Sequence, residues 1–139
     1  MAVGLVVVSH SRALAEAAVV LARGMLPGRE TVIEVAAGDV DGGLGTDATA
    51  IAAAITGADR GAGVVVLMDL GSAVLAAETA LELLDDELRG RVVLSPAPLV
   101  EGLVGAAVTA ASGAVLERVA EEALRGLAPK QAHLLGPLG

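Results

Sequence analysis

The chain has 139 residues, a length that suits one compact domain with a sizeable core. Hydrophobic residues make up 55% of it and aromatic residues are absent, so alanine, valine, leucine and glycine must fill that core. The net charge of −8 argues against nucleic-acid binding, and the lack of cysteine excludes disulfides and cysteine-ligated metals. No apolar run is built like a signal peptide or is long enough for a membrane span, so we expect a cytoplasmic protein that does not enter a membrane.

The first predicted elements are a strand and a helix. Val3 to Val8 is an apolar run rich in valine, which predicts a buried strand. A helix is predicted over Ala13 to Met25, and Pro27-Gly28 is expected to stop it. Its apolar face is expected to consist of Leu14, Ala17, Ala18, Leu21 and Met25.

A second strand and a second helix are predicted next, with a glycine-rich loop between them. The strand covers Thr31 to Ala36, and the loop covers Gly38 to Gly45. Either Thr46 or Asp47 is expected to cap the helix that follows. The apolar stripe of that helix is predicted as Ala48, Ile51, Ala52 and Ile55.

The third strand is predicted over Val64 to Met68. The segment Asp69-Leu70-Gly71-Ser72 leads from it into a helix that is expected to end near Leu84. A fourth strand is predicted over Val92 to Leu94.

Two more helices are predicted, over Leu99 to Ala111 and over Val115 to Leu124. The first of them is apolar nearly all round, with Glu101 as its only charge. A helix of this kind is buried, so we expect the sheet or a second subunit to cover it.

This alternation of strands and helices predicts an α/β fold with a parallel sheet and right-handed crossovers. We expect a small doubly wound sheet with strand order 2-1-3-4 and helices on both faces, because uninterrupted apolar strands are covered on both sides. Residues 1–126 are expected to form this domain. Residues 127–139 are expected to be a C-terminal tail, and His133 within it has no predicted role.

A candidate site lies where the strand order reverses, beyond the carboxyl ends of the first and third strands. His10 follows the first strand and Asp69 follows the third, so we expect them to face each other. Imidazole is a good nucleophile near pH 7, and a carboxylate on one ring nitrogen orients the ring and stabilises the cation formed on substitution. The pair predicts a histidine that carries a phosphoryl group.

A phosphate cradle is predicted beside this pair. Gly71 and Ser72 open a helix, whose free N–H groups and dipole favour an anion. Phosphoryl transfer needs mainly positioning and charge stabilisation, and it passes between protein histidines without a bound nucleotide. The sequence agrees, because it has no Gly-Lys-Ser or Gly-Lys-Thr. We expect no metal and no cofactor.

Each of these residues also has a plainer interpretation. A lone histidine after a strand is often only a surface residue, and Asp69 and Ser72 would serve equally as helix caps. Gly43 to Ala48 matches the dinucleotide pattern G-x-G-x-x-A, which leaves open a nucleotide-binding regulatory module. That match follows the second strand in a long loop of a short chain, which makes it weak.

Six stretches of the chain together resemble one known family. They are Val6-Val7-Val8-Ser9-His10-Ser11, Leu44-Gly45-Thr46-Asp47, Met68-Asp69-Leu70-Gly71-Ser72, Ala77-Glu78-Thr79-Ala80-Leu81-Glu82-Leu83-Leu84, Ala97-Pro98-Leu99-Val100-Glu101-Gly102 and Ala110-Ala111-Ser112-Gly113-Ala114. The family is that of DhaM, the phosphotransferase subunit of phosphoenolpyruvate-dependent dihydroxyacetone kinase. It is related to enzyme IIA of the mannose class of the sugar phosphotransferase system. The resemblance extends to about Gly126.

The resemblance implies a role for each site residue. The phosphoacceptor histidine of the family falls on His10, its partner aspartate on Asp69 and its phosphate-contacting serine on Ser72. Gly45 and Thr46 match a motif that lines the same rim.

It also implies partners. The phosphoryl group comes from the phosphocarrier HPr and passes to ADP held by the subunit DhaL, and then to dihydroxyacetone on the subunit DhaK. Family members are homodimers of the predicted fold. Because the chain stops where some relatives continue, a separate HPr is expected.

The sequence alone leaves three points open. A mannose-class enzyme IIA that feeds a sugar transporter has the same site chemistry, so it is the alternative function. The loop Gly38 to Leu44 is short beside those of relatives, and the sequence does not indicate which nitrogen of His10 is modified.

Overall fold

The computed structural model describes residues 2–26 and 31–136. At its centre lies a four-stranded parallel sheet of order β2-β1-β3-β4, which confirms the predicted order. The strands are β1 (Gly4–Ser9), β2 (Ile33–Ala37), β3 (Val64–Met68) and β4 (Val92–Ser95). Val7 lies opposite Val35 on one side and Leu67 on the other, so β1 and β3 form the interior of the sheet. The predicted α/β fold class is confirmed.

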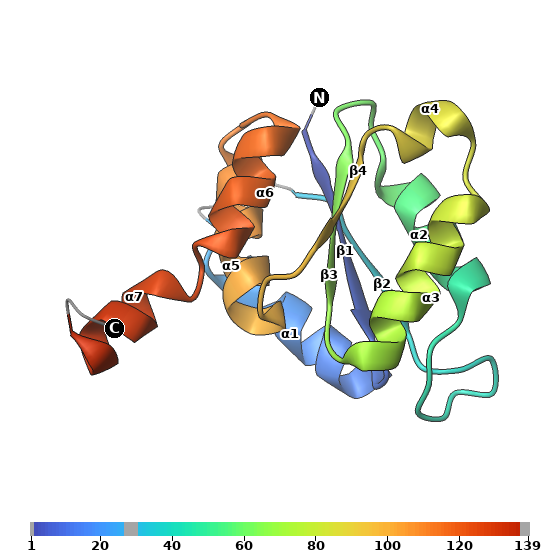
Figure 1. Cartoon of the computed structure of the whole chain (residues 1–139), viewed down its shortest axis with the longest axis horizontal. Coiled ribbons are helices and arrows are strands. Elements are labelled where there is room, and N and C mark those ends of the chain that lie inside the picture. The colour runs from blue at the N-terminus through green and yellow to red at the C-terminus, as the bar shows by residue number, and fades with distance from the viewer. Residues whose placement is uncertain (1, 27–30, 137–139) are drawn as a thin grey trace.

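Helices cover both faces of the sheet (Figure 1). The helices are α1 (Arg12–Gly24), α2 (Ala48–Ala58), α3 (Gly71–Glu82), α4 (Asp86–Arg89), α5 (Leu99–Ala111), α6 (Leu116–Leu124) and α7 (Ala128–Leu135). Helices α1, α5 and α6 lie on one face, and α2 and α3 on the other. Two apolar cores result, one on each side of the sheet. None of the helices in the described ranges is long and apolar enough to cross a membrane.

Small residues let the helices approach the sheet closely. At Gly4 an added Cβ would lie 2.1 Å from the carbonyl oxygen of Ala58, so only glycine fits there. On α1 the buried residues are all alanines, namely Ala15, Ala18 and Ala22. The core is thus packed with small side chains and contains no aromatic residues.

The predicted apolar face of α1 is wrong except at Ala18. Leu14, Leu21 and Met25 are 44–56% exposed, and Ala17 is exposed too. The larger apolar residues suggest a face toward the core, but the sheet and α5 lie so close that alanines take the inner side. The apolar stripe of α2 is confirmed at Ile51, Ala52 and Ile55, whereas Ala48 at the start of that helix is only half-buried.

Helix α5 is covered by the sheet and by α6, as expected. Its small and apolar inner residues are buried, but Val100 and Val108 remain about 40% exposed on the outer side. The burial of α5 is therefore one-sided.

Some boundaries and two short helices differ from the prediction. Strand β2 begins at Ile33 rather than at Thr31, and the expected stop at Pro27-Gly28 lies outside the described residues. Helices α4 and α7 are not predicted by the sequence pattern. Helix α7 buries none of its residues and projects away from the body of the molecule (Figure 1). The segment expected to be a tail therefore contains two helical turns.

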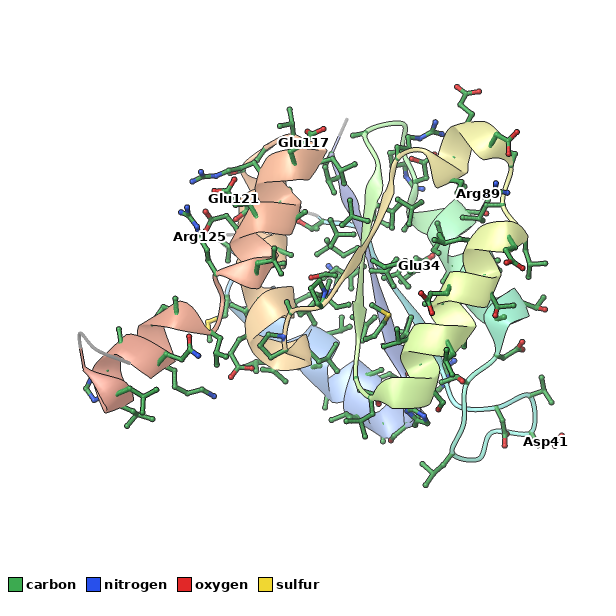
Figure 2. All side chains as sticks on the ribbon, in the orientation of Figure 1. Glu34, Asp41, Arg89, Glu117, Glu121 and Arg125 are labelled. Carbon is green, nitrogen blue, oxygen red and sulfur yellow. The ribbon has the colours of Figure 1, made fainter. Side chains whose placement is uncertain are left out.

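The outer surface of α6 carries charges that pair along the helix. Figure 2 shows Glu117, Glu121 and Arg125 on this surface. The guanidinium of Arg125 lies 3.1 Å from Glu121, four residues earlier. Exposed pairs of this kind contribute little stability. This surface is a solvated face and is not part of the candidate active site described next.

Candidate active site

The candidate site lies at the carboxyl ends of β1 and β3, which are neighbours in the sheet. Val8 of β1 is in register with Met68 of β3, and the N–H of Asp69 donates to the carbonyl oxygen of Val8 at 3.1 Å. The starts of α1 and α3 and the loop between β2 and α2 gather at this edge, at the bottom of Figure 1. The expected convergence of the two strand ends is confirmed.

The imidazole of His10 is held at both of its nitrogens. Nδ1 lies 2.9 Å from Oδ1 of Asp69, and Nε2 lies 2.5 Å from Oγ of Ser72. The His10 side chain is 27% exposed, whereas that of Asp69 is only 9% exposed. The ring thus rests on a nearly buried carboxylate and remains open to the surface.

The carboxylate of Asp69 accepts four hydrogen bonds. Oδ2 accepts from the hydroxyl of Ser9 at 2.8 Å and from the backbone N–H of His10 at 2.9 Å. Oδ1 accepts from the backbone N–H of Leu70 at 2.6 Å and faces the ring. Burial alone would raise the pKa of Asp69, but these hydrogen bonds together lower it below its ordinary value.

An ionised carboxylate only accepts hydrogen bonds, which decides the tautomer of His10. With Asp69 ionised, Nδ1 of His10 must carry the proton and donate it to Oδ1. Nε2 then has a free lone pair on the side where Ser72 lies. This is the tautomer that a nucleophilic Nε2 requires.

Ser9 is a site residue that the sequence pattern does not single out. It is fully buried at the end of β1, where its hydroxyl donates to Asp69 and accepts from the N–H of Ser11 at 3.0 Å. A serine that ends a buried apolar strand is the available signal, because a buried hydroxyl needs hydrogen-bond partners.

The start of α3 lies directly beside the ring. Its N-cap residue is Leu70, without a side-chain capping bond, so neither Asp69 nor Ser72 acts as the helix cap. Gly71 is the exposed first residue, with nothing within 4 Å of where a Cβ would be. The capping interpretation is therefore wrong, and the helix start is open to an anion.

Gly45 and Thr46 lie at the end of the loop that contacts the backbone of His10. The N–H of Gly45 donates to the carbonyl oxygen of His10 at 3.0 Å, and its φ of 154° suits glycine. Thr46 is half-buried next to it, and no hydrogen bond in the described ranges joins its side chain to His10. Gly45 therefore holds the backbone of the phosphoacceptor candidate.

The loop from Gly38 to Gly45 folds around Asp39. Its Oδ1 accepts from the N–H groups of Asp41 and Gly43, both at 2.9 Å. Figure 2 shows Asp41 at the tip of this loop.

The dinucleotide-like segment ends at a helix that already has a cap. Asp47 is the N-cap of α2, and its carboxylate accepts from the N–H of Thr49 at 3.0 Å. A pyrophosphate would need that helix start, and the carboxylate would repel it. The arrangement argues against nucleotide binding here. Within residues 2–26 and 31–136, no group of three or more His, Cys, Asp or Glu is placed to hold a metal.

Known proteins related to the chain share its sequence pattern and its fold. A family model described as "PTS system fructose IIA component" (EIIA-man) matches residues 4–120. The crystal structure of the protein of unknown function EF1359 matches with a TM-score of 0.80 and 31% identity, over 90% of this chain and 95% of that one.

Curated relatives carry a more specific description. Proteins of Pantoea ananatis and Escherichia coli K12 are 48% and 46% identical over 134 residues, or 95% of this chain. Both are phosphoryl donor subunits DhaM of PEP-dependent dihydroxyacetone kinase, and the chain spans only 28% of their length. A DhaM subunit of Listeria innocua, from dihydroxyacetone kinase 2, is 38% identical over 86% of this chain and 95% of its own length. The chain therefore belongs to the PTS system fructose IIA component family, and within it to the relatives of the DhaM phosphoryl donor subunits.

Proposed function

We propose that the chain is a phosphoryl carrier of a dihydroxyacetone kinase. It accepts a phosphoryl group from HPr on Nε2 of His10 and passes it to ADP bound in the subunit DhaL, which works with DhaK. The observation that carries the proposal is the ring of His10, oriented through Nδ1 by an ionised carboxylate, with Nε2 against the hydroxyl of Ser72 at a helix start. The names of the relatives supply the substrate.

The proposed chemistry uses the two ring nitrogens differently. The Nε2 lone pair of His10 attacks phosphorus, the N–P bond of the phosphohistidine on HPr breaks, and a new N–P bond forms on Nε2. The ring gains positive charge, which the carboxylate of Asp69 stabilises through the Nδ1 proton. No general base is needed, because Nε2 carries no proton to remove.

Ser72 and the start of α3 are proposed to hold the phosphoryl oxygens. The Ser72 hydroxyl lies 2.5 Å from Nε2. When the phosphoryl group arrives, the hydroxyl moves away from that nitrogen and donates to a phosphoryl oxygen. The N–H groups at the start of α3, at Gly71 and Ser72, add the positive end of a helix dipole. Attack by the terminal phosphate oxygen of ADP on the same phosphorus then returns the lone pair to Nε2.

Exposed leucines next to the site segments in the sequence support docking of another protein. Leu14, Leu44, Leu70 and Leu75 flank the segments that hold His10, Gly45, Asp69 and Ser72, and all four are exposed. Apolar side chains gathered around an accessible reactive group are typical of a protein-binding surface. A carrier that receives its phosphoryl group from a protein needs such a surface.

The proposed carrier consists of one domain and a tail. Residues 1–126 are the carrier domain, residues 127–139 are a tail, and the role is a cytoplasmic one. Two copies form a homodimer, which the exposed apolar residues Leu21 on α1, Met25 directly after it and Val108 on α5 support.

The second candidate is an enzyme IIA that feeds a sugar transporter. The family description as a fructose IIA component favours it, and the site chemistry is the same. Reconstitution with DhaK and DhaL, and separately with transporter domains, distinguishes the two. Activity only with the transporter would overturn the choice of dihydroxyacetone.

The first test is phosphorylation by HPr. Incubation with phosphoenolpyruvate, enzyme I and HPr is expected to give an acid-labile phosphoprotein, and His10→Ala is expected to abolish the label. The chain has two histidines, so His133→Ala on the exposed helix α7 is the matched control and keeps the label. Label that persists in His10→Ala, or that is lost in His133→Ala, contradicts the assignment.

A further inference from the structure

A cleft of about 460 Å³ opens beside the candidate active site. It lies between α3 and the segment that joins β4 to α5, at the same edge of the sheet as His10. Its apolar wall includes Met68, Val74, Leu94 and Pro96. Asp69 lines it as well, so the cleft adjoins the residue that orients the imidazole of His10.

The cleft is negatively charged without a compensating cation. Its charged lining residues are Asp69 and Glu78, and no lysine or arginine lines it. The carboxylate of Asp69 is occupied by its four hydrogen bonds. Glu78 is exposed, and none of the ion pairs among the described residues involves it. Its charge is therefore available to an incoming group.

Glu78 is also well placed relative to the phosphoryl position. It lies one turn beyond Val74 and six residues beyond Ser72 on α3, which is about 9 Å along the helix axis. Six residues also turn the helix by about 240°, so Glu78 and Ser72 project from different sides of α3, and a group bound at Glu78 does not touch the reacting ring.

We propose that this cleft receives a basic side chain of the protein that donates the phosphoryl group to His10, with Glu78 as its counter-charge. The inference rests on the proposed function and adds the feature by which the donor is recognised. The apolar wall suits the methylene stem of an arginine or lysine, and the carboxylate of Glu78 suits its charged end.

The shape and charge of the cleft favour this occupant over a small ligand. A hard metal cation prefers six or more oxygen ligands, whereas the free carboxylate of the cleft is that of Glu78, on a largely apolar wall. A nucleotide or free phosphate bound in the cleft would be repelled by that carboxylate. A basic side chain satisfies the charge and the apolar wall together.

The expected effect is on the rate at which the two proteins associate, and not on the rate of phosphoryl transfer within their complex. Opposite charges on two proteins raise the association rate, and salt screens them. Loss of the charge on Glu78 should therefore slow phosphorylation by the donor protein at limiting concentration and leave the maximal rate unchanged.

The test compares two glutamates of the same helix. Glu78→Gln lowers the second-order rate constant for phosphorylation by HPr about five- to tenfold at low ionic strength, and the loss shrinks in high salt. Glu82→Gln removes the same charge from the exposed end of α3, outside the cleft, and is expected to match the wild type. Phosphoramidate, a small donor that needs no docking surface, should label His10 equally in all three proteins.

Each other outcome rejects the inference. Equal HPr kinetics in Glu78→Gln and the wild type would show that the cleft does not recognise the donor. An equal loss in Glu82→Gln, or a matching loss with phosphoramidate, would replace recognition with a general charge effect or with damage to the site. A wild-type chain that HPr does not label would refute the proposed function itself. Labelling of the wild type is therefore measured before any variant is compared with it.

Discussion

Two aspartates at opposite ends of the sheet show how the same side chain serves different purposes. Asp59, at the end of α2, accepts from Nε and Nη2 of Arg91 at 3.1 and 2.7 Å. Asp69, at the other end, accepts from Ser9, from two backbone N–H groups and from the His10 ring. Hydrogen bonding to Arg91 is the main cause that lowers the pKa of Asp59, and several weaker donors outweigh burial to lower the pKa of Asp69.

The two aspartates differ in whether their partner keeps a lone pair that can react. The guanidinium of Arg91 stays protonated, has no lone pair to share, and links α2 to β4. The imidazole of His10 donates one proton to Asp69 and retains a lone pair on its other nitrogen. A carboxylate beside arginine holds the fold together, whereas a carboxylate beside histidine also prepares a nucleophile.

The largest expected effect comes from removing the charge of Asp69. Asp69→Asn should slow phosphorylation of His10 by about 10³- to 10⁴-fold, as loss of the equivalent orienting carboxylate does in serine proteases. The amide can donate to Nδ1, which moves the ring proton to Nε2 and blocks attack, and no charge then stabilises the substituted ring. Rapid-quench labelling with phosphorylated HPr measures the rate.

Asp59→Asn is the matched control for that variant. It removes the same charge from the far end of the sheet, so it should leave the phosphorylation rate unchanged and lower only the free energy of unfolding. Equal rate losses in the two variants would mean that the charge of Asp69 has no particular role at His10.

A smaller effect is expected in the pH dependence of stability. The pKa of each aspartate is lower in the folded chain than its ordinary value of 3.8, so each stabilises the fold above that value. This contribution is lost as the pH falls through the folded pKa. Urea unfolding followed by circular dichroism should therefore show a shallower loss of stability from pH 5 to pH 3 in Asp59→Asn and in Asp69→Asn. A slope identical to that of the wild type would contradict the lowered pKa values.

Much of the fold follows from local patterns. The valine-rich runs of β1 and β3 are typical of buried strands, and their alternation with helices favours the order β2-β1-β3-β4 that the structure has. The face of α1 that packs inward cannot be predicted from the local pattern. Which side of it packs inward depends on how closely α5 and the sheet approach, and that distance admits alanines such as Ala18 while Leu21 and Met25 stay outside.

The candidate site divides in the same way. That His10 and Asp69 meet follows from the strand order, because adjacent parallel strands end at one edge. The hydrogen bond of Ser9 to Asp69 joins residues 60 positions apart, and Gly45 holds the backbone of His10 from the end of a separate loop. Contacts of this kind depend on side-chain direction and loop conformation, which residue spacing does not encode.

The central claim is that Asp69 holds the proton on Nδ1 of His10 and leaves Nε2 to carry the phosphoryl group. Two-dimensional ¹H–¹⁵N spectra of the imidazole, recorded before and after phosphorylation by HPr, test it most directly. The account predicts that the phosphoryl group changes the ¹⁵N shift of Nε2 while Nδ1 keeps its proton. A phosphoryl group on Nδ1, or an unmodified His10 in a labelled protein, would contradict it.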